Sequence, residues 1–154
     1  MSNHVKAVPD GYNTATPYLV VRGAAKAIEF YSKAFGAQEL YRFDGPNDRI
    51  AHADLLLGTS HIMIADESED GRAASPEALN GTPVSVFLYV DDVDATVRQA
   101  VRAGANETQP VADMFWGDRY GRITDPFGHQ WQIATHKEDV TPEQMKERMA
   151  AAYS

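Results

Sequence analysis

Apolar positions along the chain follow one order that occurs twice. Strand-like runs at residues 16–21 and 85–90 each lead into a segment whose apolar residues recur every three or four positions. This spacing predicts two amphipathic helices, and Gly36 and Gly104 are placed to end them as C-terminal glycines. Asp91 or Asp92 is a suitable N-cap for the second helix. The apolar helical positions are Ala24, Ala27, Ile28, Tyr31 and Phe35 in the first segment and Val93, Val97, Ala100 and Val101 in the second.

The chain is therefore a repeat. Thr16 and Ser85 are 69 positions apart, as are Val21 and Val90, and the two closing glycines are 68 apart. Further strands are predicted after each helix, at residues 39–43, 51–57 and 61–65 and at residues 107–111, 119–124 and 130–135. The order strand, helix, three strands predicts an α+β fold of two βαβββ modules. Each sheet has a second apolar face, so the two sheets are expected to enclose a ligand cleft.

Length and charge limit the partners. A chain of 154 residues is about one domain, which we place at residues 1–137 with modules at about 14–70 and 82–137. The formal net charge of −8 argues against a nucleic-acid partner, which needs a basic face. The chain has no cysteine, and neither a signal peptide nor an 18-residue apolar run is recognisable, so we expect a cytoplasmic protein that does not enter membranes. Residues 138–154 form a tail, in which Thr141 and Gln144 make a capping box that begins a short helix from residue 142 to about 152.

Residues 113–133 are unusually rich in both aromatic residues and glycine. We interpret them as a hairpin whose first part folds over a pocket and whose second part enters the core. Asp125, Pro126 and Gly128 stand where a type I turn prefers them. The aromatic residues of this stretch are Phe115, Trp116, Tyr120, Phe127 and Trp131.

The motifs AIEFYSKAFGA, GTSHIMIADE, GDRYG and DPFGHQWQI, together with the repeat, resemble the vicinal oxygen chelate superfamily. The pattern is most similar to its PhnB-like, glyoxalase/bleomycin-resistance branch. The resemblance covers roughly residues 14 to 137. It implies incomplete barrels around a ligand cavity, completed by dimerisation or domain pairing, and hence a homodimer that binds a small molecule.

The resemblance also identifies positions at which metal-dependent members carry their ligands. These are Thr16 and Ser85 on the first strands, Met63 or Ile62 on the last strand of the first module, and Gln132 on the last strand of the second. None is a strong ligand for a divalent ion, which needs histidine, carboxylate or thiolate groups. We therefore expect no divalent metal at the usual site and no other cofactor.

Aromatic, basic and thioether side chains are the candidates for ligand binding. The rings of Phe115, Trp116 and Tyr120 offer stacking surface for an aromatic or cationic ligand, although they are equally suited to a dimer contact or a core cap. An arginine in the cavity would need an anionic partner, and a structural pair of Arg119 with Asp118 is the commoner outcome. The candidates are Phe115, Trp116, Arg119, Tyr120, Arg42 and Met63.

Acid–base candidates are fewer. His52 and Asp54 alternate on one strand, so both point to one face and can pair, either for structure or for catalysis. Glu67, at a strand end, can reach the mouth of a cleft. His61 and His129 each follow a tight turn, where the simpler interpretation is a hairpin residue bonded to neighbouring backbone.

Three functions remain open. The first is a metal-independent binding protein of the bleomycin-resistance type that holds an aromatic or cationic ligand in the inter-sheet cavity. The second is an enzyme of the lyase, isomerase or thiol-transferase class that uses a non-standard metal site or acid–base residues. The third is a structural or regulatory dimer with an incidental cavity.

Overall fold

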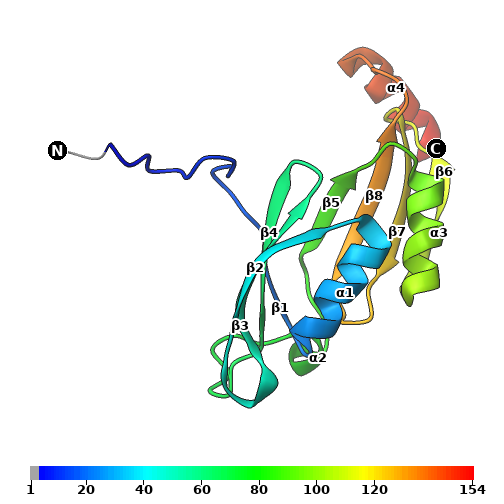
Figure 1. Cartoon of the computed structure of the whole chain (residues 1–154). Coiled ribbons are helices and arrows are strands. Elements are labelled where there is room, and N and C mark those ends of the chain that lie inside the picture. Colours follow the sequence, from blue (N-terminus) through cyan, green and yellow to red (C-terminus); the bar gives the residue numbers. More distant parts are fainter. Residues whose placement is uncertain (1–3) are drawn as a thin grey trace. The chain divides into compact units, whose positions relative to one another are not determined.

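The computed structural model describes residues 4–154 and confirms the repeat. The chain divides after Leu79 into two compact units, here called unit 1 and unit 2. Figure 1 shows a strand, a helix and three strands in each. Unit 1 contains β1 (Tyr18–Val21), α1 (Ala24–Phe35), β2 (Gln38–Asp44), η1 (Pro46–Asp48), β3 (Ile50–Leu57), β4 (Ser60–Asp66) and α2 (Pro76–Leu79). Unit 2 contains β5 (Ser85–Tyr89), α3 (Val93–Ala103), β6 (Asn106–Asp113), β7 (Asp118–Thr124), β8 (Gln130–His136) and α4 (Pro142–Ala152).

Both sheets have the same topology. Their strand orders are β1-β4-β3-β2 and β5-β8-β7-β6. The first strand of each unit pairs in parallel with the last strand of its sheet, and the other pairs are antiparallel. Tyr18 is in register with Met63, and Phe87, 69 positions after Tyr18, is in register with Gln132, 69 positions after Met63. Equivalent residues of the two units therefore pair in the same way. The predicted α+β fold is confirmed, with β1 beginning at Tyr18 rather than at residue 16.

In unit 1 the helix α1 packs against one face of the sheet, and in unit 2 the helix α3 does the same. Strand alternation directs every second side chain toward that helix, and these side chains form the core. In unit 1 they include Val21, Leu55 and Ile64, and in unit 2 Ile123, Trp131 and Ile133, none of which is more than 1% exposed. The remaining side chains of each strand lie on the opposite side, here called the open face.

Equivalent residues cap the helices α1 and α3. Asp66, at the end of β4, accepts hydrogen bonds from the backbone N–H groups of Gly23 and Ala24 at 2.8 and 2.9 Å. Thr135, 69 positions later on β8, accepts one from the N–H of Val93 at 2.8 Å. Helix N-termini leave N–H groups without partners, so the last strand of each unit satisfies the start of its helix. Asp92 is the N-cap of α3, as one of the two predicted alternatives.

The predicted turn at residues 125–128 is present. The N–H of Gly128 donates to the carbonyl of Asp125 at 3.1 Å. The Asp125 carboxylate also accepts bonds from the backbone of Phe127 and His129 and, at 2.8 Å, from the indole N–H of Trp131. Because Trp131 is fully buried, the second part of the aromatic hairpin does enter the core.

The tail helix is also as predicted, with both bonds of the capping box formed between Thr141 and Gln144. No residue of α4 is buried. Of the helices in residues 4–154, none has the length and apolar character needed to cross a membrane.

Candidate functional site

The open face of unit 2 combines exposed aromatic rings with a buried polar network. Phe87 and Tyr89 on β5 are 41% and 66% exposed, and their ring centroids lie 5.0 Å apart. The ring of Phe87 stacks 5.9 Å from that of Tyr120 on β7. Alternation on β5, β7 and β8 places these rings on the side of the sheet away from α3. Neighbouring side chains on this face are Ser85, Asp118, Arg122, Gln132 and His136.

Three uncharged side chains form a chain of hydrogen bonds across this face. The Tyr120 hydroxyl donates to Gln132 Oε1 at 2.7 Å, and Gln132 Nε2 donates to Ser85 Oγ at 2.6 Å. Burial raises the pKa of Tyr120, so its hydroxyl stays protonated as a donor. The chain therefore occupies both ends of the Gln132 amide.

Asp118 joins the aromatic residues at the next step along β7. This carboxylate is 4% exposed. Its Oδ2 accepts bonds from the Tyr89 hydroxyl and the Trp116 indole N–H, each at 3.1 Å, and its Oδ1 bonds His136 Nδ1 at 2.8 Å. The other nitrogen of His136 bonds Asp139 at 2.7 Å. These two carboxylates, Asp139 first and then Asp118, raise the pKa of His136.

Two predicted ligand-binding residues, Trp116 and Tyr120, thus lie together, with ring centroids 5.5 Å apart. Phe115 contacts Trp116 edge-to-face at 5.1 Å. Sequence reasoning overlooked Phe87 and Asp118 as site residues. Their signal was alternation, because both fall on the same face as Tyr120 once β5, β7 and β8 are paired.

The open face of unit 1 is aromatic as well. Tyr18, Tyr41 and Phe43 are 50%, 41% and 61% exposed and surround His52, whose Nδ1 bonds the Tyr18 hydroxyl at 2.9 Å. Met63, a predicted ligand contact, is half-buried and in register with Tyr18 on the same face.

Asp54 is the buried carboxylate of unit 1, with no exposed surface. It accepts hydrogen bonds from the Tyr12 hydroxyl and, at 3.4 Å, from the Tyr41 hydroxyl. Its histidine partner is His61, whose Nδ1 lies 2.9 Å from Oδ1, whereas His52 bonds Tyr18. The Tyr12 ring stacks on His61 at 3.8 Å. Sequence reasoning missed His61 here, although pairing Asp54 with Met63 directs His61 to the same face.

The other three predicted residues have partners away from these clusters. Arg119 makes two bonds to Asp94 of α3, at 2.7 and 3.0 Å, and one to Asp113 at 3.3 Å, rather than pairing with Asp118. Arg42 pairs with Glu39 at 2.6 Å. Glu67 accepts bonds from Arg22 at 2.8 Å and from Ser75 at 2.5 Å.

The family's metal-ligand positions do not form a donor set for a divalent ion. Thr16 lies just before β1, Met63 offers only a thioether, and Ser85 and Gln132 bond each other. Within residues 4–154, no group of three or more histidine, cysteine, aspartate or glutamate side chains is arranged to hold a metal. Divalent ions in proteins need charged oxygen, imidazole or thiolate donors, so the residues present do not fit the ion.

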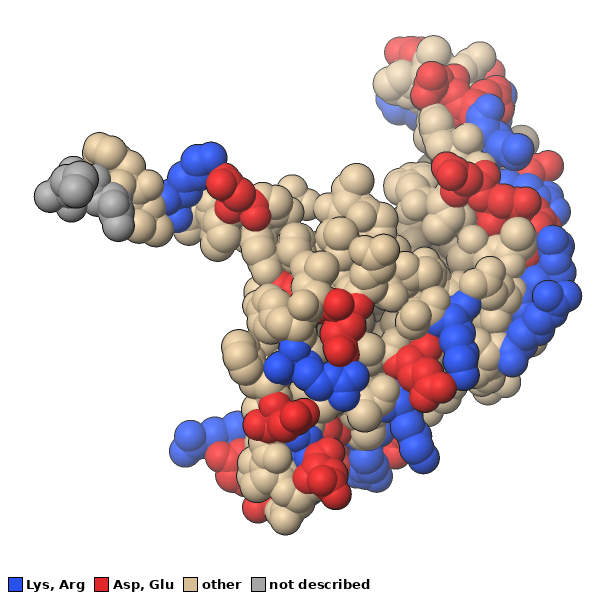
Figure 2. Space-filling model, viewed as in Figure 1, with Lys and Arg blue, Asp and Glu red and all other residues tan. Residues whose placement is uncertain are grey.

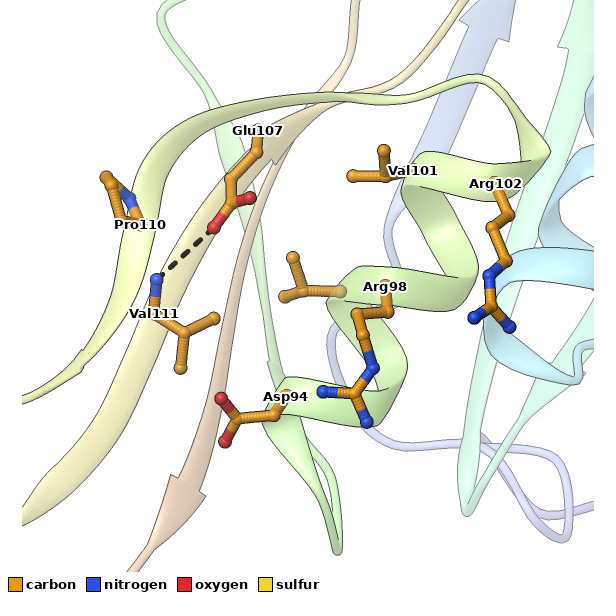
Figure 3. Close-up of a pocket in the computed structure, with 8 residues that line it drawn as sticks. Asp94, Arg98, Val101, Arg102, Glu107, Pro110 and Val111 are labelled. Carbon is orange, nitrogen blue, oxygen red and sulfur yellow. Dashed lines mark hydrogen bonds between the residues drawn. The ribbon is translucent and has the colours of Figure 1, made fainter.

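A groove of about 450 Å³ lies on the helix side of unit 2, between α3 and β6 (Figure 3). Its lining consists of three valines and a proline together with two acidic and two basic side chains. The Glu107 carboxylate accepts a hydrogen bond from the N–H of Val111, four residues further along β6, at 3.3 Å. The groove shares no residue with the open face. The groove residues are Asp94, Val97, Arg98, Val101, Arg102, Glu107, Pro110 and Val111.

Charge is mixed over the surface. On the face in Figure 2, basic side chains lie among acidic ones rather than in a broad basic tract. Binding to a phosphate backbone relies on such a tract. On that face, charge gives no support to a nucleic-acid partner.

Comparison with known proteins identifies the family. Residues 3–133 match the model of the Glyoxalase/Bleomycin resistance protein/Dioxygenase superfamily, and the chain belongs to it. An uncharacterised protein of Mycobacterium tuberculosis is 40% identical over 139 residues, covering 88% of this chain and 82% of its own. Protein YjdN of Escherichia coli is 26% identical and covers 82% of this chain and 97% of its own.

Solved structures agree with this assignment. A gene product of Arabidopsis thaliana has a TM-score of 0.65 at 28% identity, covering 80% of this chain and 98% of its own. TioX from Micromonospora sp. ML1 has a TM-score of 0.63 at 27% identity, with the same coverage. A PhnB protein from Bacillus cereus, at 16% identity and a TM-score of 0.62 over 80% of this chain and 99% of its own, shares the fold.

Proposed function

We propose that this protein binds a small molecule without a metal ion, and that the open face of unit 2 takes an aromatic or cationic ligand. The observation that carries the proposal is the uncharged chain Tyr120–Gln132–Ser85 beside the exposed rings of Phe87 and Tyr89. A metalloenzyme of this superfamily would need charged donors there. This chain instead has a neutral network and a stacking surface.

Physical chemistry favours a ligand that is planar, positively charged, or both. Aromatic faces attract cations and stack with other rings, each contact contributing about 0.5–2 kcal/mol. The Asp118 carboxylate accepts from the Tyr89 hydroxyl and the Trp116 indole N–H, so its negative charge lies at the edge of these rings and favours a nearby cation. An anion gains no such attraction, because the faces of aromatic rings carry negative charge density.

A thermal-shift screen of chelator-treated protein tests this function. Benzyltrimethylammonium is a suitable probe because it joins a ring to a fixed positive charge, and benzoate is its anionic counterpart. The proposal requires that the first raises the melting temperature more than the second. Replacing Phe87 and Tyr89 together by alanine should abolish the shift, while the exposed control Leu79→Ala should leave it unchanged. A shift that survives the double substitution would exclude this face as the site.

A second candidate, metal-independent acid–base catalysis, is favoured by the Asp54–His61 pair. A buried carboxylate that holds one nitrogen of a histidine orients the ring for proton transfer at the other nitrogen. In this structure the second nitrogen of His61 lies beside the backbone of Gly11, so substrate would have to displace the segment before β1. The two functions separate in a His61→Gln variant, which should keep ligand binding under the first proposal and lose all turnover under the second.

We also propose that the protein forms a homodimer. All seven residues of the edge strand β2 are exposed, among them Leu40, Tyr41 and Phe43. Exposed apolar edge strands are normally covered by another element or another chain. Light scattering with size-exclusion chromatography should give twice the chain mass. A monomer at micromolar concentration would contradict this proposal without touching the proposed ligand site.

A further inference from the structure

We infer that the C-terminal helix α4 is a strap that holds the Trp116 loop (residues 114–117) against the open face of unit 2, and that Arg148 is the residue that fastens it. The expected effect of Arg148 on ligand affinity rests on the proposed function. The position of the loop can be measured without any ligand.

The tail helix does not contribute to the core. None of its residues is buried, and it begins at Pro142, beyond the last residue of the family match, 133. Isolated helices of this length are marginal in water, so α4 depends on the few contacts it makes. Those contacts are concentrated on the Trp116 loop and on the connector that follows β8.

Arg148 makes the polar contacts. Its guanidinium forms two bonds with the Glu138 carboxylate, at 2.9 and 2.6 Å, and a third with the backbone carbonyl of Phe115 at 3.3 Å. A planar fork that meets a carboxylate at two points has a fixed orientation. Beside it, the ring of Tyr153 lies edge-to-face on Phe115 at 6.3 Å. One arginine therefore links α4, the connector and the Trp116 loop.

The connector is itself tied to the loop. The carbonyl of Gly117 accepts bonds from the N–H groups of Lys137 and Glu138 at 2.9 and 3.0 Å. The two backbones approach so closely that a Cβ at Gly117 would lie 2.3 Å from the carbonyl oxygen of Glu138, and φ at Gly117 is +101°. Only glycine meets both conditions. The Trp116 loop therefore packs against the same connector, residues 137–138, whose Glu138 carboxylate pairs with Arg148.

The Trp116 loop connects these contacts of α4 with the open face of unit 2. Trp116 donates from its indole to the Asp118 oxygen that also accepts the Tyr89 hydroxyl, and its ring contacts Tyr120. Movement of the loop would remove the indole donor from the buried Asp118 carboxylate and would separate the Trp116 ring from Tyr120. Release of α4 should therefore expose Trp116 and weaken a ligand held by these rings.

Fluorescence quenching by acrylamide tests the strap. The chain has two tryptophans, and Trp131 is fully buried, so Trp116→Phe provides the background for subtraction. In full-length protein, Arg148→Ala should raise the quenching of Trp116, and any loss of far-ultraviolet circular dichroism should not exceed the helical signal of α4. Arg148→Lys, which cannot make the two-point contact, should give an intermediate value. Lys146→Ala, an exposed change on the same helix, should match the wild type.

Binding of benzyltrimethylammonium supplies the second readout. Loss of an exposed ion pair corresponds to up to about a fivefold change in Kd, so Arg148→Ala should weaken the probe about three- to fivefold and Lys146→Ala should not. Equal Trp116 quenching in Arg148→Ala and Lys146→Ala would overturn the strap. If the wild type does not bind the probe, the proposed ligand class fails, and the quenching data still decide whether Arg148 holds the loop.

Discussion

The hydroxyl of Tyr120 donates a hydrogen bond of 2.7 Å to the side-chain carbonyl of Gln132, and the amide nitrogen of Gln132 donates a second hydrogen bond to the Ser85 hydroxyl. Gln132 is the position at which the family resemblance places the carboxylate of metal-dependent members. A carboxylate there would have lone pairs for an ion, whereas this amide has used both of its ends within the protein. The same face carries the exposed rings of Phe87 and Tyr89, and its buried carboxylate, Asp118, already accepts bonds from Tyr89, Trp116 and His136.

Gln132→Glu should restore the charge without restoring a metal site. The carboxylate can accept from both the Tyr120 and the Ser85 hydroxyls, but it places a charge at a half-buried position, so we expect a loss of about 1–3 kcal/mol in the free energy of unfolding. Urea denaturation measures it, with Gln130→Glu on the same strand as the control. Elemental analysis should find no stoichiometric divalent ion, because Thr16, Met63 and Ser85 add no charged donor. Tight binding of zinc or manganese by this variant would show that the site is closer to a metal centre than we conclude.

Asp118→Asn should loosen the aromatic surface. Asp118 accepts from Tyr89, Trp116 and His136, and an asparagine presents an N–H₂ group to at least one of those donors. We expect a loss of about 1–3 kcal/mol in the free energy of unfolding and greater acrylamide quenching of Trp116. Asp113→Asn, an exposed carboxylate at the end of β6, is the control. Unchanged quenching in Asp118→Asn would mean that the carboxylate does not hold the indole.

Stability should fall as pH rises through the titration of His136. Its pKa is raised in the folded protein, so the folded state binds the proton more tightly than the unfolded chain. The resulting stabilisation is complete below the pKa of an unfolded histidine, about 6.5, and is lost as pH rises through the higher folded value. The difference in unfolding free energy between wild type and His136→Gln should therefore be larger at acidic than at mildly alkaline pH. A difference that does not vary with pH would show that the contacts with Asp118 and Asp139 do not depend on the imidazolium.

The repeat and its local signals were predictable because they depend on nearby residues. Apolar spacing located both helices, Gly36 and Gly104 ended them, and the turn at residues 125–128 and the capping box of α4 each lie within four consecutive residues. The placement of Trp131 in the core followed from the same turn. Such features are set by backbone geometry and local hydrogen bonds, which the sequence states directly.

The partners of the charged residues could not be predicted in the same way. Arg119 pairs with Asp94, 25 positions away on α3, rather than with its neighbour Asp118. Asp54 bonds His61 on the next strand and Tyr12 from the segment before β1. These choices depend on which strands pair, on their register and on which segments pack against them, and no local spacing specifies these.

Tyr12→Phe should test how much the segment before β1 contributes to unit 1. The substitution keeps the ring stacked on His61 and removes the hydroxyl that donates to the buried Asp54. A buried carboxylate deprived of a donor costs about 1–3 kcal/mol of stability. Tyr153→Phe, at a 77% exposed tyrosine, should cost almost nothing in the same urea titration. Equal stability of the two variants would indicate that the Tyr12 hydroxyl does not stabilise the fold.

Calorimetric titration of benzyltrimethylammonium into protein freed of metal by a chelator tests the central claim most directly. The account predicts one-to-one binding that is unchanged when zinc, nickel or manganese is added back and is abolished by replacing Phe87 and Tyr89 with alanine. Binding that appears only after a divalent ion is restored, or that persists in the double variant, would contradict it.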